Sequence, residues 1–365
     1  MSDVEIVTSS LYKSGDESNV KLFDQNSVDY YCSLFGFFLP SPPVSIYVLI
    51  WVWLIRSFYM AYAISVTVFI FAEFVTTKRL SWVLFNLILS VKCICIAYII
   101  IRLNENIDTI RGSAQYHSLA RQAYEMSLLY FRPVVLLQLI VYIVWVIIRY
   151  GAFPLGYWVL FAMYLVFGTY GFACGVGTVT FMCITETLHL QEKLLELGAL
   201  AERQTLCKSD FLDAVKVLES KKKGVYRMND LMLGSALLNT AVLIVLLFTY
   251  RSITADRTYF FSVWYVVYVI TMLFLSDISY LFVVLPLMSR CNDMMRALSA
   301  RVASDTWDTS VEAKRIDVLM AMVAVPLQVT FVGIEMTKAE MMRRLIGLAV
   351  GVLSVMAKYM QMELQ

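Results

Sequence analysis

The feature that most constrains the fold of this 365-residue sequence is a series of long apolar stretches, each about the length that crosses a lipid bilayer. Hydrophobic residues make up 60% of the chain and charged residues only 16%. This composition is typical of integral membrane proteins and not of soluble ones. Hydropathy predicts seven spans, at 44–75, 81–101, 130–150, 155–186, 233–253, 259–289 and 317–362.

The sequence therefore predicts an all-α, polytopic membrane protein with seven transmembrane helices. The last stretch is too long for one crossing, and we expect it to break around 333–337 into an inner and an outer half. The long segments between spans read as charged amphipathic helices. The expected organisation is a cytosolic tail with an amphipathic pre-helix (1–43), spans one to four (44–186), a cytosolic helical loop (187–232), spans five and six (233–289), and an inner helix with the last span (290–365).

The distribution of basic residues predicts the orientation. With the N-terminus inside, the cytosolic side carries most of the Lys and Arg residues, as the positive-inside rule requires. This places the N-terminus in the cytosol and the C-terminus outside, the reverse of a G-protein-coupled receptor. The outer side then carries only Lys78, Arg79, Arg149, Arg251, Arg257 and Lys358.

Several other classes of function find no support in the sequence. The net charge of +2 gives no indication of nucleic-acid binding, and no enzyme signature is present. The seven cysteines form no CxxC pair or Cys/His cluster, so we expect no metal, no cofactor and no disulfide framework. We expect both histidines, His117 and His189, to be surface loop residues. The glycines of 171–177 lie within an apolar span and predict close helix packing.

The final apolar stretch carries its polar residues on one line. Ser354, Lys358, Gln361 and Gln365 follow one another at intervals of four, three and four, so they share a narrow face of a helix. Lipid offers no hydrogen bonds, so such a face needs another helix or water as its partner. Two interpretations remain open at this point, helix packing and a water-filled pore. In a pore, apolar neighbours such as Met362 close the path by dewetting.

This stretch resembles the last segment of insect gustatory receptors, a family of seven-helix chemoreceptor channels. Their signature is Thr-Tyr, five mostly apolar residues and Gln-Phe; here Tyr359 precedes MQMEL and Gln365, which keeps the spacing. The preceding residues 315–341 resemble the family's penultimate segment, in which a helix ends at a Phe/Gly turn; compare Phe331 and Gly333. Two positions depart from the signature, because Lys358 replaces the threonine and no phenylalanine follows Gln365.

The resemblance implies a multi-pass plasma-membrane protein that forms a homotetrameric, ligand-gated ion channel. It implies that the final helix lines the pore, that helix extensions form a cytosolic anchor, and that cations are conducted. Its partners would be lipid, ions, a small organic ligand and other copies of itself. Four lysines at 358 would repel cations. Either Lys358 snorkels outward, which we favour, or it becomes neutral, or the pore prefers anions.

Aromatic residues gather at the outer ends of the predicted spans. An interfacial belt explains the outermost of them. In the resembling family the ligand pocket lies among the outer halves of spans two to six, and an aromatic wall with a few polar groups suits a small organic ligand. The candidate ligand-binding residues are Phe85, Asn86, Trp145, Phe161, Tyr164, Trp264 and Tyr268.

Three ionisable residues, Arg56, Lys92 and Asp277, lie inside predicted spans, where charge is costly. Lys92 and Asp277 are at similar depths and are candidates for an ion pair, whereas Arg56 is nearer the inner face and can snorkel. Alternatively, one of them polarises a ligand cavity. A secondary transporter that uses Lys92 and Asp277 as a coupling pair remains a third hypothesis, and a G-protein-coupled chemoreceptor a second.

Overall fold

The protein was analysed as a computed structural model, which is predominantly helical, as the sequence predicts. Side chains in the long helices are described over most of 46–64, 170–219 and 283–304. The residues that the structure describes are 31, 34, 46–77, 94, 98, 119–129, 132, 136, 140, 155–221, 230, 234, 263–304, 307–325, 329–331, 334, 335, 337–344, 346, 347, 350, 351 and 354.

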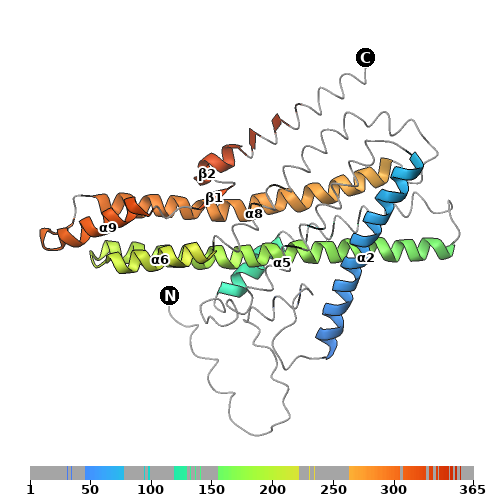
Figure 1. Cartoon of the computed structure of the whole chain (residues 1–365), viewed down its shortest axis with the longest axis horizontal. Helices are drawn as coiled ribbons and strands as arrows, with labels where there is room; N and C mark the ends of the chain where they lie inside the picture. Colours follow the sequence, from blue (N-terminus) through green and yellow to red (C-terminus); the bar gives the residue numbers. More distant parts are fainter. Residues whose placement is uncertain are drawn as a thin grey trace, which may run out of the picture.

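Two long helices form the axis of the described fold. Helix α5 spans Leu155–Glu202, and α8 spans Val263–Ala303, so they measure about 72 and 62 Å at the usual rise per residue. They lie side by side and run in the same direction (Figure 1). Among the described helices, none meets the length and hydropathy expected of a membrane span.

Polar contacts join α5 and α8 at two heights. The side-chain amide of Gln191 donates a 2.8 Å hydrogen bond to the carbonyl of Leu287. About three turns further along, Arg301 donates to the carbonyl of Gly198 at 3.3 Å and forms an ion pair with Glu202. The partners in these pairs are separated by nearly the same number of residues, which shows that the two helices run in the same direction.

The centre of α5 is covered on every side. All residues from Cys174 to Gln191 are buried, including several threonines. Each threonine hydroxyl donates to the carbonyl four residues earlier, which satisfies it without a partner on another helix. These bonds run from Thr178, Thr180, Thr185 and Thr187, at 2.7–2.9 Å. The helix can therefore occupy the centre although its sequence there is partly polar.

The prediction for His189 was wrong. We expected a surface loop residue, but His189 lies inside α5 and is only 6% exposed. The helix extends past the predicted end of the fourth span, and this extension is still enclosed by neighbouring elements. His117 lies outside the described residues. Gly175 and Gly177 lie in the fully buried part of α5, where the absence of a side chain allows neighbours to approach closely.

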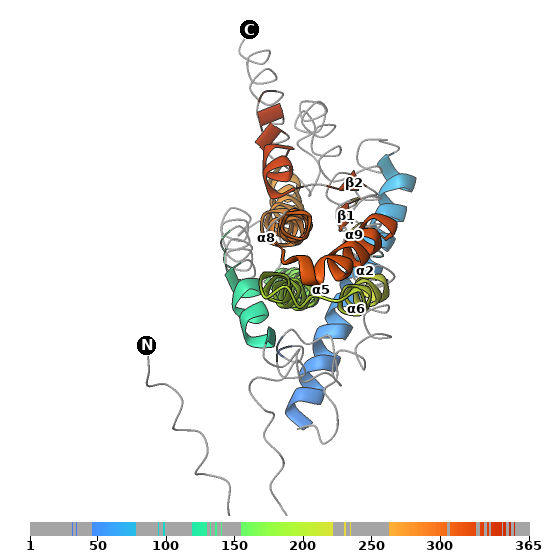
Figure 2. The same cartoon turned by 90° about the vertical axis from the view of Figure 1, so that its left-hand side faces the viewer.

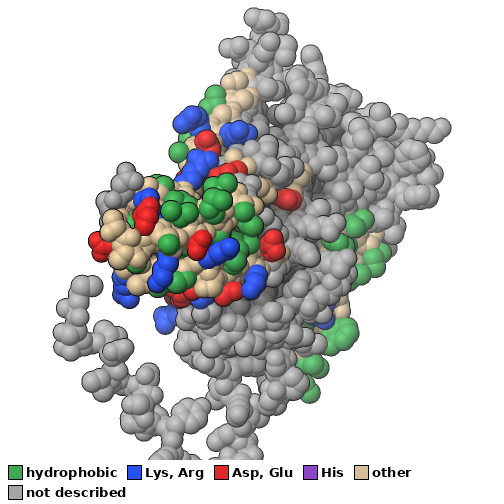
Figure 3. All heavy atoms as spheres, turned by 60° about the vertical axis from the view of Figure 1, so that its left-hand side comes forward, with side chains coloured by type: hydrophobic (Ala, Val, Ile, Leu, Met, Phe, Trp, Pro, Cys, Tyr) green, Lys and Arg blue, Asp and Glu red, His purple; other side chains and the backbone are tan. Residues whose placement is uncertain are grey.

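At one end of the α5–α8 pair, the chain reverses direction after each of the two helices (Figure 2). Helix α6, Lys208–Lys221, packs against α5, and α9, Glu312–Ala324, packs against both α8 and α6. A short 3₁₀ helix, η2 at Thr309–Val311, leads into α9. Basic, acidic and hydrophobic side chains are interspersed over this end (Figure 3).

The turn after α5 contains a strained residue. The amide of Thr205 bonds to the carbonyl of Leu200 at 2.9 Å and that of Gln204 to Ala201 at 3.1 Å, the pair of bonds that defines a Schellman cap. Glycine is usual at the left-handed position of this cap, but here it is Gln204, with φ of 56°. Its side-chain oxygen accepts a 3.0 Å bond from the amide of Asp308, which ties the α5–α6 turn to the start of η2.

We expect Gln204→Ala to destabilise the protein more than Gln204→Gly. Alanine keeps the cost of the left-handed backbone and loses the bond to Asp308, a loss of about 1 kcal/mol. Glycine also loses that bond but relieves a comparable backbone cost, so its effect stays within about 0.5 kcal/mol of zero. Thermal unfolding of the purified protein in detergent measures both. The reverse order of the two variants would show that the left-handed backbone at this turn carries no cost.

Helix α2, Ile46–Thr77, crosses α5 and contacts it through one narrow stripe (Figure 1). Val52, Ile55 and Tyr59 are buried along this stripe, at helical spacing. Trp51 makes an edge-on contact with Tyr170, with ring centroids 6.1 Å apart. Outside the stripe, α2 exposes large apolar side chains: Ile46, Tyr47, Leu49, Ile50, Trp53, Leu54, Met60 and Ile64.

A tyrosine from the N-terminal region is also part of the core. Tyr31 is buried and stacks on Tyr124, with ring centroids 4.5 Å apart, and it lies 6.1 Å from the ring of Phe181 on α5. Tyr124 belongs to a described helical segment, 119–129, whose Ala120 is fully buried. The aromatic contact thus joins three segments that are far apart in the sequence.

Candidate functional site at the start of the final helix

The final helix is separated from α9 by a short hairpin. Helix α9 ends at Ala324, and helical residues resume at Lys338. Between them, β1 (Thr330–Phe331) and β2 (Ile334–Glu335) pair antiparallel. The described interruption, 325–337, contains the break expected around 333–337 but begins earlier. The residue after Val325 in the sequence is a proline, which disfavours helical geometry at Val325, whose backbone (φ −133°, ψ 87°) has left the helical region.

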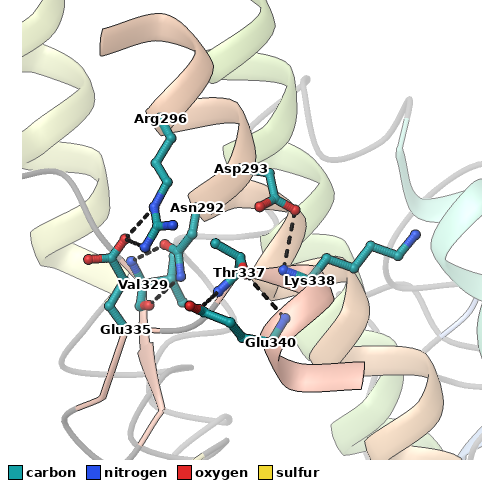
Figure 4. Close-up of polar contacts among 8 residues, drawn as sticks. All are labelled: Asn292, Asp293, Arg296, Val329, Glu335, Thr337, Lys338 and Glu340. Carbon is teal, nitrogen blue, oxygen red and sulfur yellow. Dashed lines mark hydrogen bonds and ion pairs between the residues drawn. The ribbon is translucent and has the colours of Figure 1, made fainter. Parts of the chain in front are cut away.

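A buried asparagine on α8 holds the chain just before the hairpin. The side-chain amide of Asn292 donates to the carbonyl of Val329 at 2.8 Å, and its oxygen accepts from the amide of Val329 at 2.8 Å (Figure 4). Asn292 is 1% exposed, and Val329 is equally buried. One side chain therefore satisfies both backbone groups of a residue that lacks other backbone partners in a sheet or helix. We call this pair of bonds the Asn292 clamp.

Two further residues of α8 contact the chain on the other side of the hairpin. Arg296 binds the Glu335 carboxylate through two nitrogens, at 3.2 and 3.3 Å. The carboxylate of Asp293 accepts a 3.3 Å hydrogen bond from the amide of Lys338, the first residue of the final helix (Figure 4). Negative charge at a helix N-terminus is favourable because the first amides there have no partners within the helix.

The final helix begins with a reciprocal cap. The amide of Thr337 donates to the Glu340 carboxylate at 2.9 Å, and the amide of Glu340 donates to the Thr337 hydroxyl at 3.2 Å. This is a capping box, which satisfies two amides that would otherwise lack partners. The bonds from Thr337, the backbone one first, together with Arg296 and Arg344, hold the pKa of Glu340 below its usual 4.5. Glu340 precedes the apolar stretch that starts at Leu345.

We expect this cap to weaken in acid. A lowered pKa stabilises the folded state above the ordinary value of 4.5, and this contribution is lost as the pH falls through the folded-state pKa. Glu340→Gln keeps an oxygen that can accept the bond from Thr337 but does not titrate near this pH. The hydrogen-exchange rate of the Thr337 amide in the wild type, divided by that in Glu340→Gln, should rise below about pH 4. A constant ratio between about pH 3 and 7 would contradict the role of the Glu340 charge.

Among the predicted pore residues, the structure describes Ser354. It is exposed, and its hydroxyl donates to the carbonyl of Val350 at 2.8 Å. Gly347 and Gly351, close to the same face, are exposed, and an added Cβ on either would meet nothing within 4 Å. This face is thus uncovered within one chain. Four of the predicted pore residues lie outside the described residues: Lys358, Gln361, Met362 and Gln365.

The predicted ligand residues are only partly described. The backbone places Phe161 and Tyr164 near the start of α5 and Trp264 and Tyr268 near the start of α8. Because the two helices are parallel, all four lie at the same end of the pair (Figure 1). Their side chains are not described, so a shared pocket stays a prediction. Phe85, Asn86 and Trp145 lie outside the described residues.

The three predicted intramembrane charges are not brought together by the described residues. Arg56 lies on α2 and is half-buried. Asp277 lies on α8, and its side chain is not described, while Lys92 lies outside the described residues. The Lys92–Asp277 pair therefore stays a prediction. Among the described residues, no group of three or more His, Cys, Asp or Glu side chains could hold a metal ion.

The sequence matches no protein-family model and no curated protein. The function must therefore be argued from the residues themselves.

Sequence reasoning missed the polar contacts between α8 and the hairpin. The clamp residue Asn292 lies in a charged segment that we read only as an inner helix. One signal was readable, because Thr337 and Glu340 have the spacing of a capping box directly before an apolar stretch. No pattern in the sequence indicates that Asn292 meets Val329, which is 37 residues away.

Proposed function

We propose that this chain is the subunit of a homotetrameric, ligand-gated ion channel of the plasma membrane. In this proposal a small organic ligand binds among the outer halves of the helices, and the final helix lines a central, cation-conducting pore. The last helix is split into the inner α9 and an outer, pore-lining half. The fold that we propose has seven spans, a cytosolic N-terminus and a cytosolic anchor made of the ends of α5 and α8 with α6 and α9.

The observation that carries this proposal is the uncovered face of the final helix. Gly347, Gly351 and Ser354 are exposed in a single chain, together with the apolar Val350 beside them, and the sequence continues the polar line through Lys358 and Gln361. In lipid, a polar and small-residue face needs either another helix or water. Four copies around an axis supply both, because each face then borders neighbours and a wet centre.

A second observation supports the lipid environment. Helix α2 buries one stripe against α5 and exposes eight large apolar side chains elsewhere, among them Tyr47, Trp53 and Ile64. A helix that is apolar all round belongs either in a protein interior or in a bilayer. Since this face of α2 is not covered by protein in one chain, lipid is the environment that suits it.

A third observation supports self-association. Helix α9 exposes Ile316, Met320 and Val323 at intervals of four and three, so they form one apolar stripe. They are 49%, 67% and 81% exposed. The stripe lies at the end that we assign to the cytosol, where lipid does not cover it. Contact with another copy of the chain would remove it from water.

Three measurements test the proposal. Particle images of the detergent-solubilised protein should show fourfold symmetry, whereas a monomer with an internal cavity would favour a G-protein-coupled receptor or a transporter. Tags at each end, probed on intact cells, should label only at the C-terminus. In planar bilayers with a gradient of potassium chloride, the protein should give discrete single-channel currents whose reversal potential lies nearer that of potassium than that of chloride. Labelling at the N-terminal tag alone would overturn the orientation and with it the channel.

A further inference from the structure

The inner parts of α5 and α8 form a fixed support. Gln191 ties α5 to Leu287 at one height, and Arg301 ties α8 to Gly198 and Glu202 at another. Buried apolar side chains of both helices fill the interval between the two ties. We call residues 191–202 and 287–301 the α5–α8 frame.

The frame holds the chain on both sides of the hairpin. Asn292, Asp293 and Arg296 project from little more than one turn of α8. They contact the chain before β1, at the end of β2 and at the first residue of the final helix (Figure 4). A hairpin fixed at both of its ends cannot tilt independently of its support. The start of the final helix therefore takes its position from α8 and not from α9, which precedes it in the sequence.

The three contacts differ in strength. The ion pair of Arg296 with Glu335 is substantially exposed, and such pairs contribute little. The bond to Asp293 is single and long, at 3.3 Å. The Asn292 clamp consists of two bonds of 2.8 Å between fully buried groups, and breaking it would leave a buried amide and carbonyl without partners. Asn292 is thus the dominant attachment.

We propose that Asn292 is a positioning residue that couples the final helix to the α5–α8 frame and so sets the equilibrium between closed and open pore. This inference rests on the proposed channel function. In this proposal the residue acts through the backbone of Val329 and not by lining the pore or binding a ligand. A helix released from the frame would change how often the pore opens and not what passes through it.

The attachment itself can be measured without any channel activity. Hydrogen exchange of the full-length protein in detergent should be at least about tenfold faster in Asn292→Ala at amides 329 and 338, because two buried bonds are lost. Amides 191–202 should be unaffected. Ser289→Ala is the matched control, since Ser289 is buried one turn earlier on α8 and its hydroxyl donates to the carbonyl of Pro286 in its own helix. Unchanged exchange, or an equal rise in both regions, would overturn the coupling.

Single-channel recording in planar bilayers without ligand tests the consequence. In Asn292→Ala the spontaneous open probability should change by about tenfold or more, in either direction, while unitary conductance and reversal potential stay as in wild type. An unchanged open probability together with faster exchange would show that Asn292 stabilises the fold but does not influence pore opening, and would overturn the proposal. If the wild-type protein itself carries no current, the proposed function fails, and the exchange experiment still decides the attachment.

Should Asn292→Ala fail to accumulate, a milder change keeps the test decisive. Asp293→Ala removes the bond from the amide of Lys338 to α8, so exchange should rise there and not at Val329. Unchanged exchange at Lys338 in this variant would show that α8 does not hold the start of the final helix, and would overturn the proposal.

Discussion

Lys358→Thr is expected to raise the permeability of cations relative to anions about tenfold. Even where Lys358 snorkels to the outer mouth of the pore, four ammonium groups roughly 6 Å from an entering cation would repel it by about 3 kcal/mol in water before screening, and salt would reduce this to on the order of 1–2 kcal/mol. The threonine is also the residue that the resembling family has at this position. Reversal potentials in a potassium chloride gradient measure the change. Lys358→Thr should shift them more than Gln365→Ala does.

The controls for this prediction lie in the same chain. Lys216→Thr removes an equal charge from α6, where Lys216 is exposed and paired with Asp213, and it should leave selectivity unchanged. Gln365→Ala removes a hydrogen-bonding group on the same line as Lys358 and should alter conductance. If both Gln365→Ala and Lys358→Thr behave as wild type at normal expression, the final helix does not line the pore and the helix-packing interpretation stands.

Met320→Glu should dissociate the assembly. Burial of a methionine side chain contributes about 1.5–3 kcal/mol, and this contribution recurs in every subunit of a symmetric oligomer. A carboxylate there would also have to be buried without a partner. The mass of the purified particle in detergent, measured by light scattering, should fall from that of a tetramer toward that of a single chain. The side chain is 67% exposed, so the fold of the isolated chain should tolerate the change.

Lys314→Ser is the matched control, because Lys314 is exposed on α9 but does not belong to the apolar stripe. It should leave the particle mass unchanged. A tetramer that persists in Met320→Glu would show that the α9 stripe is not a subunit contact. Such a result would leave the pore prediction at Lys358 intact, since Met320 lies on α9, before the hairpin, and Lys358 comes after the hairpin in the sequence.

Much of the helical pattern could be predicted because it depends on local sequence. The expected fourth span, 155–186, and the start of the expected cytosolic helical loop, 187–232, correspond to α5, which ends at Glu202. The burial of His189 could not be predicted in the same way. Periodicity indicates which face of a helix is apolar, but it does not indicate that neighbours cover the polar face too.

The polar site shows a similar division. A proline after Val325 and the Thr337/Glu340 pair mark the end of one helix and the start of the next, and both signals are local. The Asn292 clamp depends on where α8 passes the hairpin, which is a tertiary relation. The sequence does not indicate which residue an asparagine binds when the bond is to the backbone, because nearly every residue has the same amide and carbonyl groups.

The sequence separations of these contacts also have a consequence for folding. The clamp closes a loop of 37 residues, whereas the ties of Gln191 to Leu287 and of Glu202 to Arg301 close loops of 96 and 99. The longer closures cost about 0.9 kcal/mol more in chain entropy. The hairpin can therefore dock on α8 soon after synthesis, before α8 packs against α5. Helix α8 and the hairpin would then pack as one preformed unit against the helices that were synthesised earlier.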